Sequence, residues 1–241
     1  MSQTPHFYRL LRTRQTLEYV DRMNTEYTHF GIPIEFWKAM SLLEPEDFIM
    51  SVYMVNAIRD DGYPRWFQFV GLLHALGKVM YIKGCDNDGT STTHQWGILG
   101  ETFILGCKLP DSCIYPHMNW GNPDLMNKFI DIELGIYTTN CGLTNCKMSW
   151  GHGEYLYHVV KNHTNRFPQA GLWCIRYQEL YPWHTHSDYS HLTDSFDDMY
   201  LYWVRLLVGY KKTPIDGKIT FDRDYCSSLV TEFLGPSLIY F

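Results

Sequence analysis

The run of apolar residues from Phe67 to Leu76 constrains the fold of this chain more than any other part of its sequence. Apolar residues in helical spacing predict a central helix over 66–81, which carries one histidine, His74, and ends in a Gly-Lys pair. The residue after the histidine is Ala75. A carboxylate at this position could bridge two metal ions, whereas the methyl group of alanine cannot.

Apolar periodicity and helix-start signals predict a mostly α-helical chain, since strand signals are scarce. Further helices are expected over 8–30, 34–43, 48–59, 122–135, 155–161, 168–181, 194–211 and 223–234. Pro182 is expected to stop one of them. No internal repeat or low-complexity linker interrupts the sequence, which favours a single domain over 1–241 with residues 1–30 as an N-terminal helical arm.

Charge and hydropathy exclude several classes of partner. The net charge is −6 and no basic tract is present, which disfavours nucleic acid. No apolar run reaches the length of a membrane span, and the N-terminus lacks the apolar region of a secretory signal. We therefore expect an intracellular protein, in the cytoplasm or nucleus.

The chain has seven cysteines and no CxxC pair, so a structural zinc site is not expected. Reduced, largely buried thiols are the simplest interpretation, with a redox pair of Cys141 and Cys146 as the alternative. The polar loop 84–93 resembles a fragment of a calcium loop, but a plain surface loop fits its spacing better. Four further possible metal ligands lie close together in the sequence: His184, His186, Asp188 and His191. A new metal site formed by them is not expected either.

Several strings resemble those of the myo-inositol oxygenases, the di-iron branch of the HD-domain superfamily. They include WFQFVGLLHALGK at 66–78, MSWGHGEYLY at 148–157 and IRYQELYPWHT at 175–185. The resemblance runs in order from about residue 12 to the C-terminus. It implies a single-domain, HD-type helical bundle with irregular loops.

In that family, two iron ions are held by four histidines and two aspartates. The resemblance places these six positions at Ile49, His74, Ala75, His152, Gln178 and Lys211. Four of the six ligands are therefore absent, and the two vestigial histidines would serve different irons. One imidazole does not hold a ferrous ion, and the Lys211 ammonium would repel a cation. No metal, no cofactor and no catalytic residue are predicted, and both histidines are expected to be hydrogen-bonded core residues.

The residues that would contact substrate have changed as well. The family's inositol-binding lysine corresponds to Lys78, and its Gly-Asp pair corresponds to Gly100 and Glu101. Its His-Ser pair becomes Gln178-Glu179, and an acidic loop before residue 48 is largely deleted. Since unpaired buried charges are costly, we expect a salt-bridged cluster in the vestigial pocket of Lys78, Lys211, Glu101 and Glu179.

The leading hypothesis is a catalytically inactive member of this type with a structural, self-assembling role, for example a storage or occlusion-body matrix protein. Its partners would be copies of itself, in an oligomer or a lattice. The alternative is a non-catalytic module that either binds a polyol or another small ligand or has a regulatory role. An active di-iron oxygenase or a phosphohydrolase is the third possibility, and metal analysis distinguishes it from the others.

Overall fold

The computed structural model describes residues 5–213, 219–235 and 238–241, and the predicted mostly α-helical fold is confirmed. Contacts divide the chain into two compact units, and each unit combines three segments of the sequence. The loop-rich unit comprises Met1–Tyr27, Tyr81–Gly151 and Glu179–Tyr202, and the helical unit comprises Thr28–Met80, His152–Gln178 and Trp203–Phe241. A single domain over 1–241 stays a prediction.

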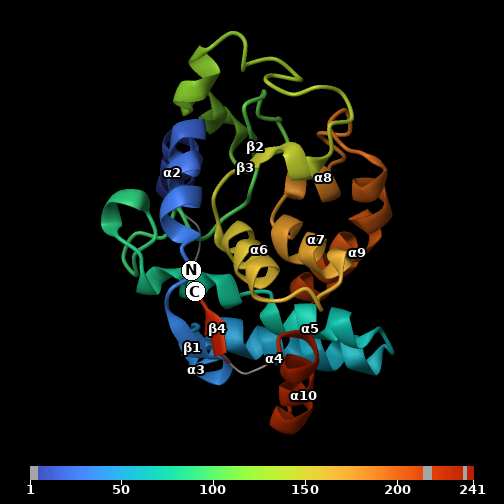
Figure 1. Cartoon of the computed structure of the whole chain (residues 1–241). Coiled ribbons are helices and arrows are strands. Elements are labelled where there is room, and N and C mark those ends of the chain that lie inside the picture. Colours follow the sequence, from blue (N-terminus) through green and yellow to red (C-terminus); the bar gives the residue numbers. More distant parts are fainter. Residues whose placement is uncertain (1–4, 214–218, 236–237) are drawn as a thin grey trace. The chain divides into compact units, whose positions relative to one another are not determined.

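The helical unit is built on the predicted central helix. Helix α5 (Arg65–Leu73) packs against α4 (Pro45–Asp60), α7 (Gln169–Tyr177) and α10 (Arg223–Phe233), and α6 (His152–His163) packs against α7 (Figure 1). Seven of the nine residues of α5 are buried, as its composition requires. The unit also contains the short helix α3 (Phe36–Met40), the later part of α9 (Ser195–Lys212), and an antiparallel pair of β1 (Pro33–Glu35) with β4 (Leu238–Tyr240).

The loop-rich unit holds most of the irregular chain. Its regular elements are α1 (Pro5–Arg14), α2 (Leu17–Tyr27), α8 (Tyr181–His184), the first part of α9, and an antiparallel pair of β2 (Ile104–Leu105) with β3 (Lys147–Met148). Short 3₁₀ turns connect them, at Asp86–Asp88, Pro116–Gly121, Pro123–Met126 and Leu143–Asn145. Further 3₁₀ structure, η1, follows α5 over Leu76–Ile82.

The helix predicted over 8–30 is two helices, because polar contacts hold the chain open at Gln15. The Gln15 side chain accepts a hydrogen bond from the backbone nitrogen of Trp150 at 2.7 Å and donates to the Trp150 carbonyl oxygen at 2.8 Å. Asn122 Nδ2 donates to the carbonyl oxygen of Gln15, and Thr16 Oγ1 accepts from the backbone of Tyr19 in the first turn of α2. The break exchanges helix hydrogen bonds for buried tertiary ones.

The central helix is also interrupted, after His74. Gly77 follows the break, and a Cβ atom on Gly77 would lie 2.0 Å from the carbonyl oxygen of His152. The chain after α5 therefore continues as a tighter turn in close contact with the start of α6. The predicted helix over 122–135 is wrong as well, since regular structure there ends at Met126.

Two further expectations need correction. Pro182 lies in the first turn of α8 and helps to begin that helix, as proline can at a helix start. The polar loop 84–93 is not wholly a surface loop, because Asp88 is buried and accepts a 2.6 Å hydrogen bond from the Tyr27 hydroxyl. Across the described residues, no helix combines the length and the apolar character needed to cross a bilayer.

Candidate functional site

All six positions that the resemblance assigns to metal ligands lie in the helical unit, so their mutual geometry can be examined. Helix α4 carries Ile49, His74 and Ala75 follow directly after the end of α5, and α6 begins at His152. The last two positions, Gln178 and Lys211, lie just after α7 and in the last turn of α9.

His74 is held as a buried, neutral imidazole. Its Nδ1 lies 2.9 Å from the carbonyl oxygen of Gly71 and 3.4 Å from Ser51 Oγ. A carbonyl oxygen only accepts hydrogen bonds, so Nδ1 carries the proton. Burial, followed by the positive charge of Lys211, lowers the pKa of His74 from 6.5 to about 3. The expectation of a hydrogen-bonded core histidine fits this environment.

Gln178 connects the two neighbouring positions. Its Nε2 donates to the backbone carbonyl oxygen of His74 at 2.9 Å and to that of Ile175 at 3.3 Å. Its Oε1 accepts a 3.1 Å hydrogen bond from Lys211 Nζ. The fully buried amide therefore uses both of its polar ends, and it orients a half-buried ammonium toward the end of α5.

The other positions offer no donor atoms that could replace those lost. Ala75 is buried and apolar, whereas Ile49 is 44% exposed on α4. Ser51, on the same helix, is the α4 side chain that reaches His74, and the sequence analysis missed it. Its signal was a lone serine in an apolar stretch of helix. His152 is buried at the start of α6, close enough to His74 to act on its charge.

Lys78 forms an ion pair within the helical unit. Its Nζ lies 2.6 Å from Asp47 Oδ1, and each side chain is roughly one-quarter exposed. Asp47 belongs to the short remnant of the acidic loop, in the first turn of α4. The lysine that would contact inositol in the family is thus neutralised by a residue of its own unit.

The donor set of the helical unit does not fit a pair of iron ions. The polar groups at the six positions are two imidazoles, one amide and one ammonium, whereas the resemblance implies a set with two carboxylates. An ammonium has no lone pair to give, and its charge opposes that of a metal cation at short range. Within the described part of the chain, no group of three or more His, Cys, Asp or Glu side chains is arranged to hold a metal ion.

The remaining substrate-shell positions lie in the loop-rich unit, where Glu101 is fully buried with Arg12. The carboxylate pairs with the Arg12 guanidinium, accepts a 2.8 Å hydrogen bond from the backbone of Ile114, and lies near Glu179. Arg12 also donates to Asn119 Oδ1 at 2.9 Å. Burial, followed by nearby carboxylates that include Glu179, raises the pKa of Tyr181. The pair is a polar centre that sequence analysis did not predict, because it could not place the arginine of the N-terminal arm.

The predicted four-residue salt-bridge cluster is wrong for two of its members. Glu101 pairs with Arg12, and Lys78 pairs with Asp47, so neither needs a partner from the predicted set.

Gly100, beside Glu101, has a φ of 93°, and a Cβ there would lie 3.0 Å from the ring of Phe7. Glycine at this position lets α1 approach the Glu101 segment closely.

The other possible ligand cluster is not assembled either. His184 Nδ1 lies 3.0 Å from Thr185 Oγ1, Asp188 accepts a hydrogen bond from Ser112, and His191 Nε2 lies 3.0 Å from the carbonyl oxygen of Glu133. Each of these three side chains therefore has a hydrogen-bond partner outside the set. Closeness in sequence does not bring these residues together into one site.

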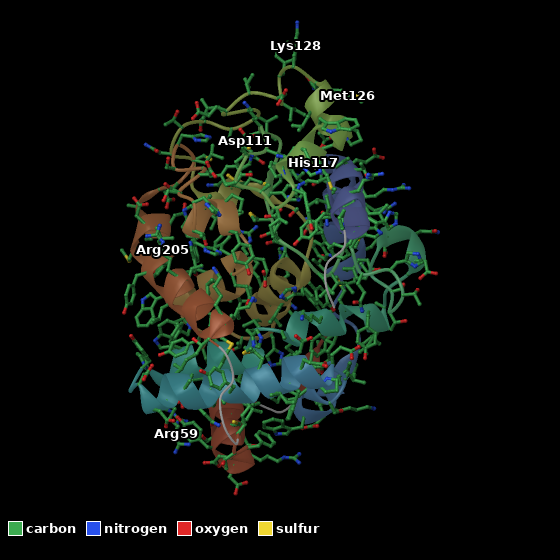
Figure 2. All side chains as sticks on the ribbon, turned by 180° about the vertical axis from the view of Figure 1, so that it is seen from behind. Arg59, Asp111, His117, Met126, Lys128 and Arg205 are labelled. Atoms are coloured by element: carbon green, nitrogen blue, oxygen red, sulfur yellow. The ribbon has the colours of Figure 1, made fainter. Side chains whose placement is uncertain are left out.

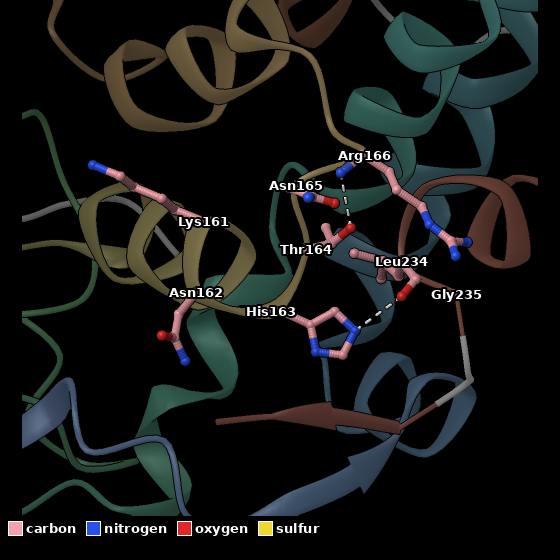
Figure 3. Close-up of a pocket in the computed structure, with 8 residues that line it drawn as sticks. All are labelled: Lys161, Asn162, His163, Thr164, Asn165, Arg166, Leu234 and Gly235. Carbon is pink, nitrogen blue, oxygen red and sulfur yellow. Dashed lines mark hydrogen bonds between the residues drawn. The ribbon is translucent and has the colours of Figure 1, made fainter.

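A polar pocket of about 420 Å³ lies elsewhere on the helical unit, between the end of α6 and the end of α10 (Figure 3). His163 Nε2 lies 3.1 Å from the Leu234 carbonyl oxygen at its wall, and Arg166 lines the same pocket. Neither residue belongs to the six mapped positions. This pocket therefore gives no support to an oxygenase site.

Comparison with known proteins agrees with the resemblance seen in the strings. The family model described as myo-inositol oxygenase matches residues 1–240. An inositol oxygenase of Dictyostelium discoideum is 33% identical over an alignment of 252 positions. The alignment covers 96% of this chain and 84% of the relative. An inositol oxygenase of Mus musculus is 33% identical with the same coverage, and one of Danio rerio is 34% identical over 82% of this chain and 73% of the relative. The chain described here belongs to the myo-inositol oxygenase family.

Proposed function

We propose that this chain is a non-catalytic member of its family, in which a lysine ammonium has replaced the metal. The observation that carries the proposal is the contact of Lys211 Nζ with Gln178 Oε1 at 3.1 Å, with Gln178 in turn hydrogen-bonded to the His74 backbone. Two positions that would both bind iron in the family are thus bonded to each other, and the amide oxygen at one is occupied by an ammonium that has no lone pair for a metal.

In this proposal, the metal ligands were lost together with changes in the residues around them. Ala75 is packed as a core residue, and Lys78 is paired with Asp47. Restoring any one ligand would leave the other three absent. A weakened metal site would show a missing ligand among surviving donors, whereas this set has been replaced by one that is satisfied without a cation.

Metal analysis and turnover test this proposal directly. Protein purified without oxygen and incubated with ferrous iron is expected to retain no stoichiometric iron after desalting and to leave myo-inositol unconsumed. A Lys211→Met variant is the matched control, since it removes the charge and adds no ligand, and it is expected to behave alike. Retention of stoichiometric iron by the unaltered protein, or oxygen-dependent loss of inositol, contradicts the proposal.

For its role, we propose self-assembly, with a storage or occlusion-body matrix protein as one form of it. The support is a group of exposed apolar side chains, here called the apolar ridge, within residues 120–136 of the loop-rich unit: Trp120, Met126, Phe129, Ile132 and Ile136. Trp120 and Met126 are 81% and 85% exposed, and Met126 points outward in Figure 2. Large apolar side chains exposed in one segment are candidates for a protein–protein contact.

Sedimentation velocity over a range of concentrations tests self-assembly. The unaltered protein is expected to form oligomers or larger assemblies, and Phe129→Glu is expected to shift it toward the monomer. Met199→Glu is the matched control, because Met199 is exposed on α9 outside the ridge. A monomer at every concentration, or equal effects of the two substitutions, speaks against this role.

A small-ligand module is the second candidate, and one observation favours it. In the described residues, three buried polar atoms of the loop-rich unit lack a hydrogen-bond partner: Arg12 Nη1, Glu101 Oε2 and Thr102 Oγ1. Buried donors and acceptors are normally satisfied, so a polyol hydroxyl is one group that could complete them. Thermal denaturation with millimolar myo-inositol tests this candidate, and an unchanged midpoint removes it.

A further inference from the structure

Two cysteines of the loop-rich unit lie close together with no covalent bond between them. The Sγ atoms of Cys141 and Cys146 are 3.7 Å apart, on either side of a short 3₁₀ turn over Leu143–Asn145. The Cys141 thiol is half-buried and the Cys146 thiol is buried. An oxidant can therefore approach Cys141 first.

The loop around the two thiols is held in place by its backbone. Asn140 and Gly142 both have positive φ angles, of 56° and 84°. The backbone nitrogen of Gly142 donates to the Leu192 carbonyl oxygen at 2.8 Å, and that of Leu143 donates to the buried Asp197 carboxylate at 2.8 Å. Asn145 Nδ2 closes the turn by donating to the Cys141 carbonyl oxygen at 2.7 Å. These contacts fix the cysteine backbones at either end of the turn.

The thiols themselves have weak partners that a bond would replace. The Cys141 thiol points at the Leu192 carbonyl oxygen at 3.8 Å, and the Cys146 thiol at the Gly142 carbonyl oxygen at 3.6 Å. Sulfur atoms in a disulfide are about 2.0 Å apart, so each needs to move by roughly 1 Å. Rotation of the two side chains can supply that movement while the backbone stays in place.

We propose that Cys141 and Cys146 form a redox-active dithiol that closes to an intramolecular disulfide when the protein meets a hydroperoxide. In the first step, the Cys141 thiolate attacks a peroxide oxygen, becomes a sulfenic acid and releases hydroxide. The Cys146 sulfur then attacks the Cys141 sulfur, the S–S bond forms, and water leaves. In sum, two thiols and one hydrogen peroxide give one disulfide and two waters.

Burial affects the rate of this reaction. Desolvation, followed by the nearby Cys141 charge, raises the pKa of the Cys146 thiol. A raised pKa keeps Cys146 protonated near neutral pH, so the closing step becomes faster as the pH rises. Among the described cysteines, Cys85 is exposed and Cys107, Cys113, Cys174 and Cys226 are buried, which limits competing attack at the latter four.

Peptide mapping tests the proposal without any substitution. Trypsin cleaves after Lys128 and Lys147, and the peptide between these sites contains both cysteines and no other. The folded protein is treated with stoichiometric hydrogen peroxide, blocked with N-ethylmaleimide, denatured and digested. We expect this peptide to be two hydrogen atoms lighter than the dithiol and to carry no maleimide. A peptide with two maleimides, recovered while Cys85 is oxidised, overturns the proposal.

A second measurement separates the built geometry from simple closeness in sequence. The disulfide is equilibrated with a glutathione buffer in the folded protein and again in guanidinium chloride. Preorganisation by the loop is expected to raise the effective concentration of the two thiols at least about tenfold in the folded state. An equal or lower value in the folded protein overturns the proposal. Cys107→Ser is the control that excludes pairing of Cys141 with its buried neighbour, and it is expected to leave closure unchanged.

Discussion

At the scale of single residues, the chain shows how charged side chains are accommodated in and near its interior. Lys211 and Gln178 satisfy each other, and Lys78 is paired with Asp47. Glu101 is the extreme case, because its carboxylate is fully buried against the Arg12 guanidinium. A buried pair of this kind contributes little net stability by itself, but removing one partner leaves an uncompensated charge in the interior.

The first prediction concerns this pair. Arg12→Met keeps an unbranched side chain and removes its charge, so Glu101 is left without its counter-ion. We expect the free energy of unfolding, measured with urea, to fall by about 3–5 kcal/mol. Lys147→Met is the control in the same unit, since the Lys147–Asp21 pair is exposed and should contribute less than about 1 kcal/mol. Similar losses for both variants would show that Glu101 does not depend on Arg12.

At the scale of elements, the ends of helices are decided by contacts that the local sequence does not contain. Helix α5 stops at Leu73, and the turns that follow fit against α6 because Gly77 has no side chain. Helix α9, by contrast, continues through Gly209, which has open space around it. Both glycines lie in predicted helices, but only Gly77 is required by a close contact, whereas a side chain at Gly209 would meet no neighbour.

The second prediction compares these glycines. In Gly77→Ala, the new methyl group would lie 2.0 Å from the His152 carbonyl oxygen, so backbone must move. We expect a loss of about 3 kcal/mol in the free energy of unfolding, at the upper end for overpacking. Gly209→Ala meets nothing within 4 Å and should stabilise the protein by about 0.5–1 kcal/mol. Equal effects of the two changes in urea titrations would refute the close contact at Gly77.

At the scale of the whole molecule, buried tyrosines make stability sensitive to alkali. Burial is the first cause that raises the pKa of each of five buried or half-buried tyrosines from the ordinary value of 10.0: Tyr19, Tyr137, Tyr155, Tyr181 and Tyr189. Above pH 10 the unfolded chain loses these protons while the folded protein keeps them. The unfolded state then binds fewer protons, so stability must fall as the pH rises.

The third prediction follows from that sign. Each retained proton lowers the free energy of unfolding by about 1.4 kcal/mol per pH unit once the pH is well above 10. Several such groups together exceed the usual margin of about 5–15 kcal/mol, so we expect cooperative unfolding between about pH 11 and 12. Circular dichroism and tyrosinate absorbance should change together. Full tyrosine ionisation near pH 10 with the helical signal retained would contradict this account.

Some properties of this protein are fixed by its sequence alone. The chemistry of single side chains is one, because the methyl group of Ala75 and the ammonium of Lys211 offer no lone pair to a metal ion in any conformation. The helices α4, α9 and α10 are another, since their apolar spacing and start signals are local. The helices of the structure confirm the predicted mostly α-helical fold, and the match to the family model confirms the predicted family.

Tertiary structure decided the rest, because the deciding partners are far apart in the chain. Gln15 breaks the first helix through contacts with Trp150, 135 positions away, and Gln178 holds the end of α5 from a distance of 104 positions. The Arg12–Glu101 pair, which the sequence analysis did not predict, spans 89 positions. Periodicity describes one element at a time, whereas a buried charge or amide is satisfied by whichever group the folded chain brings beside it.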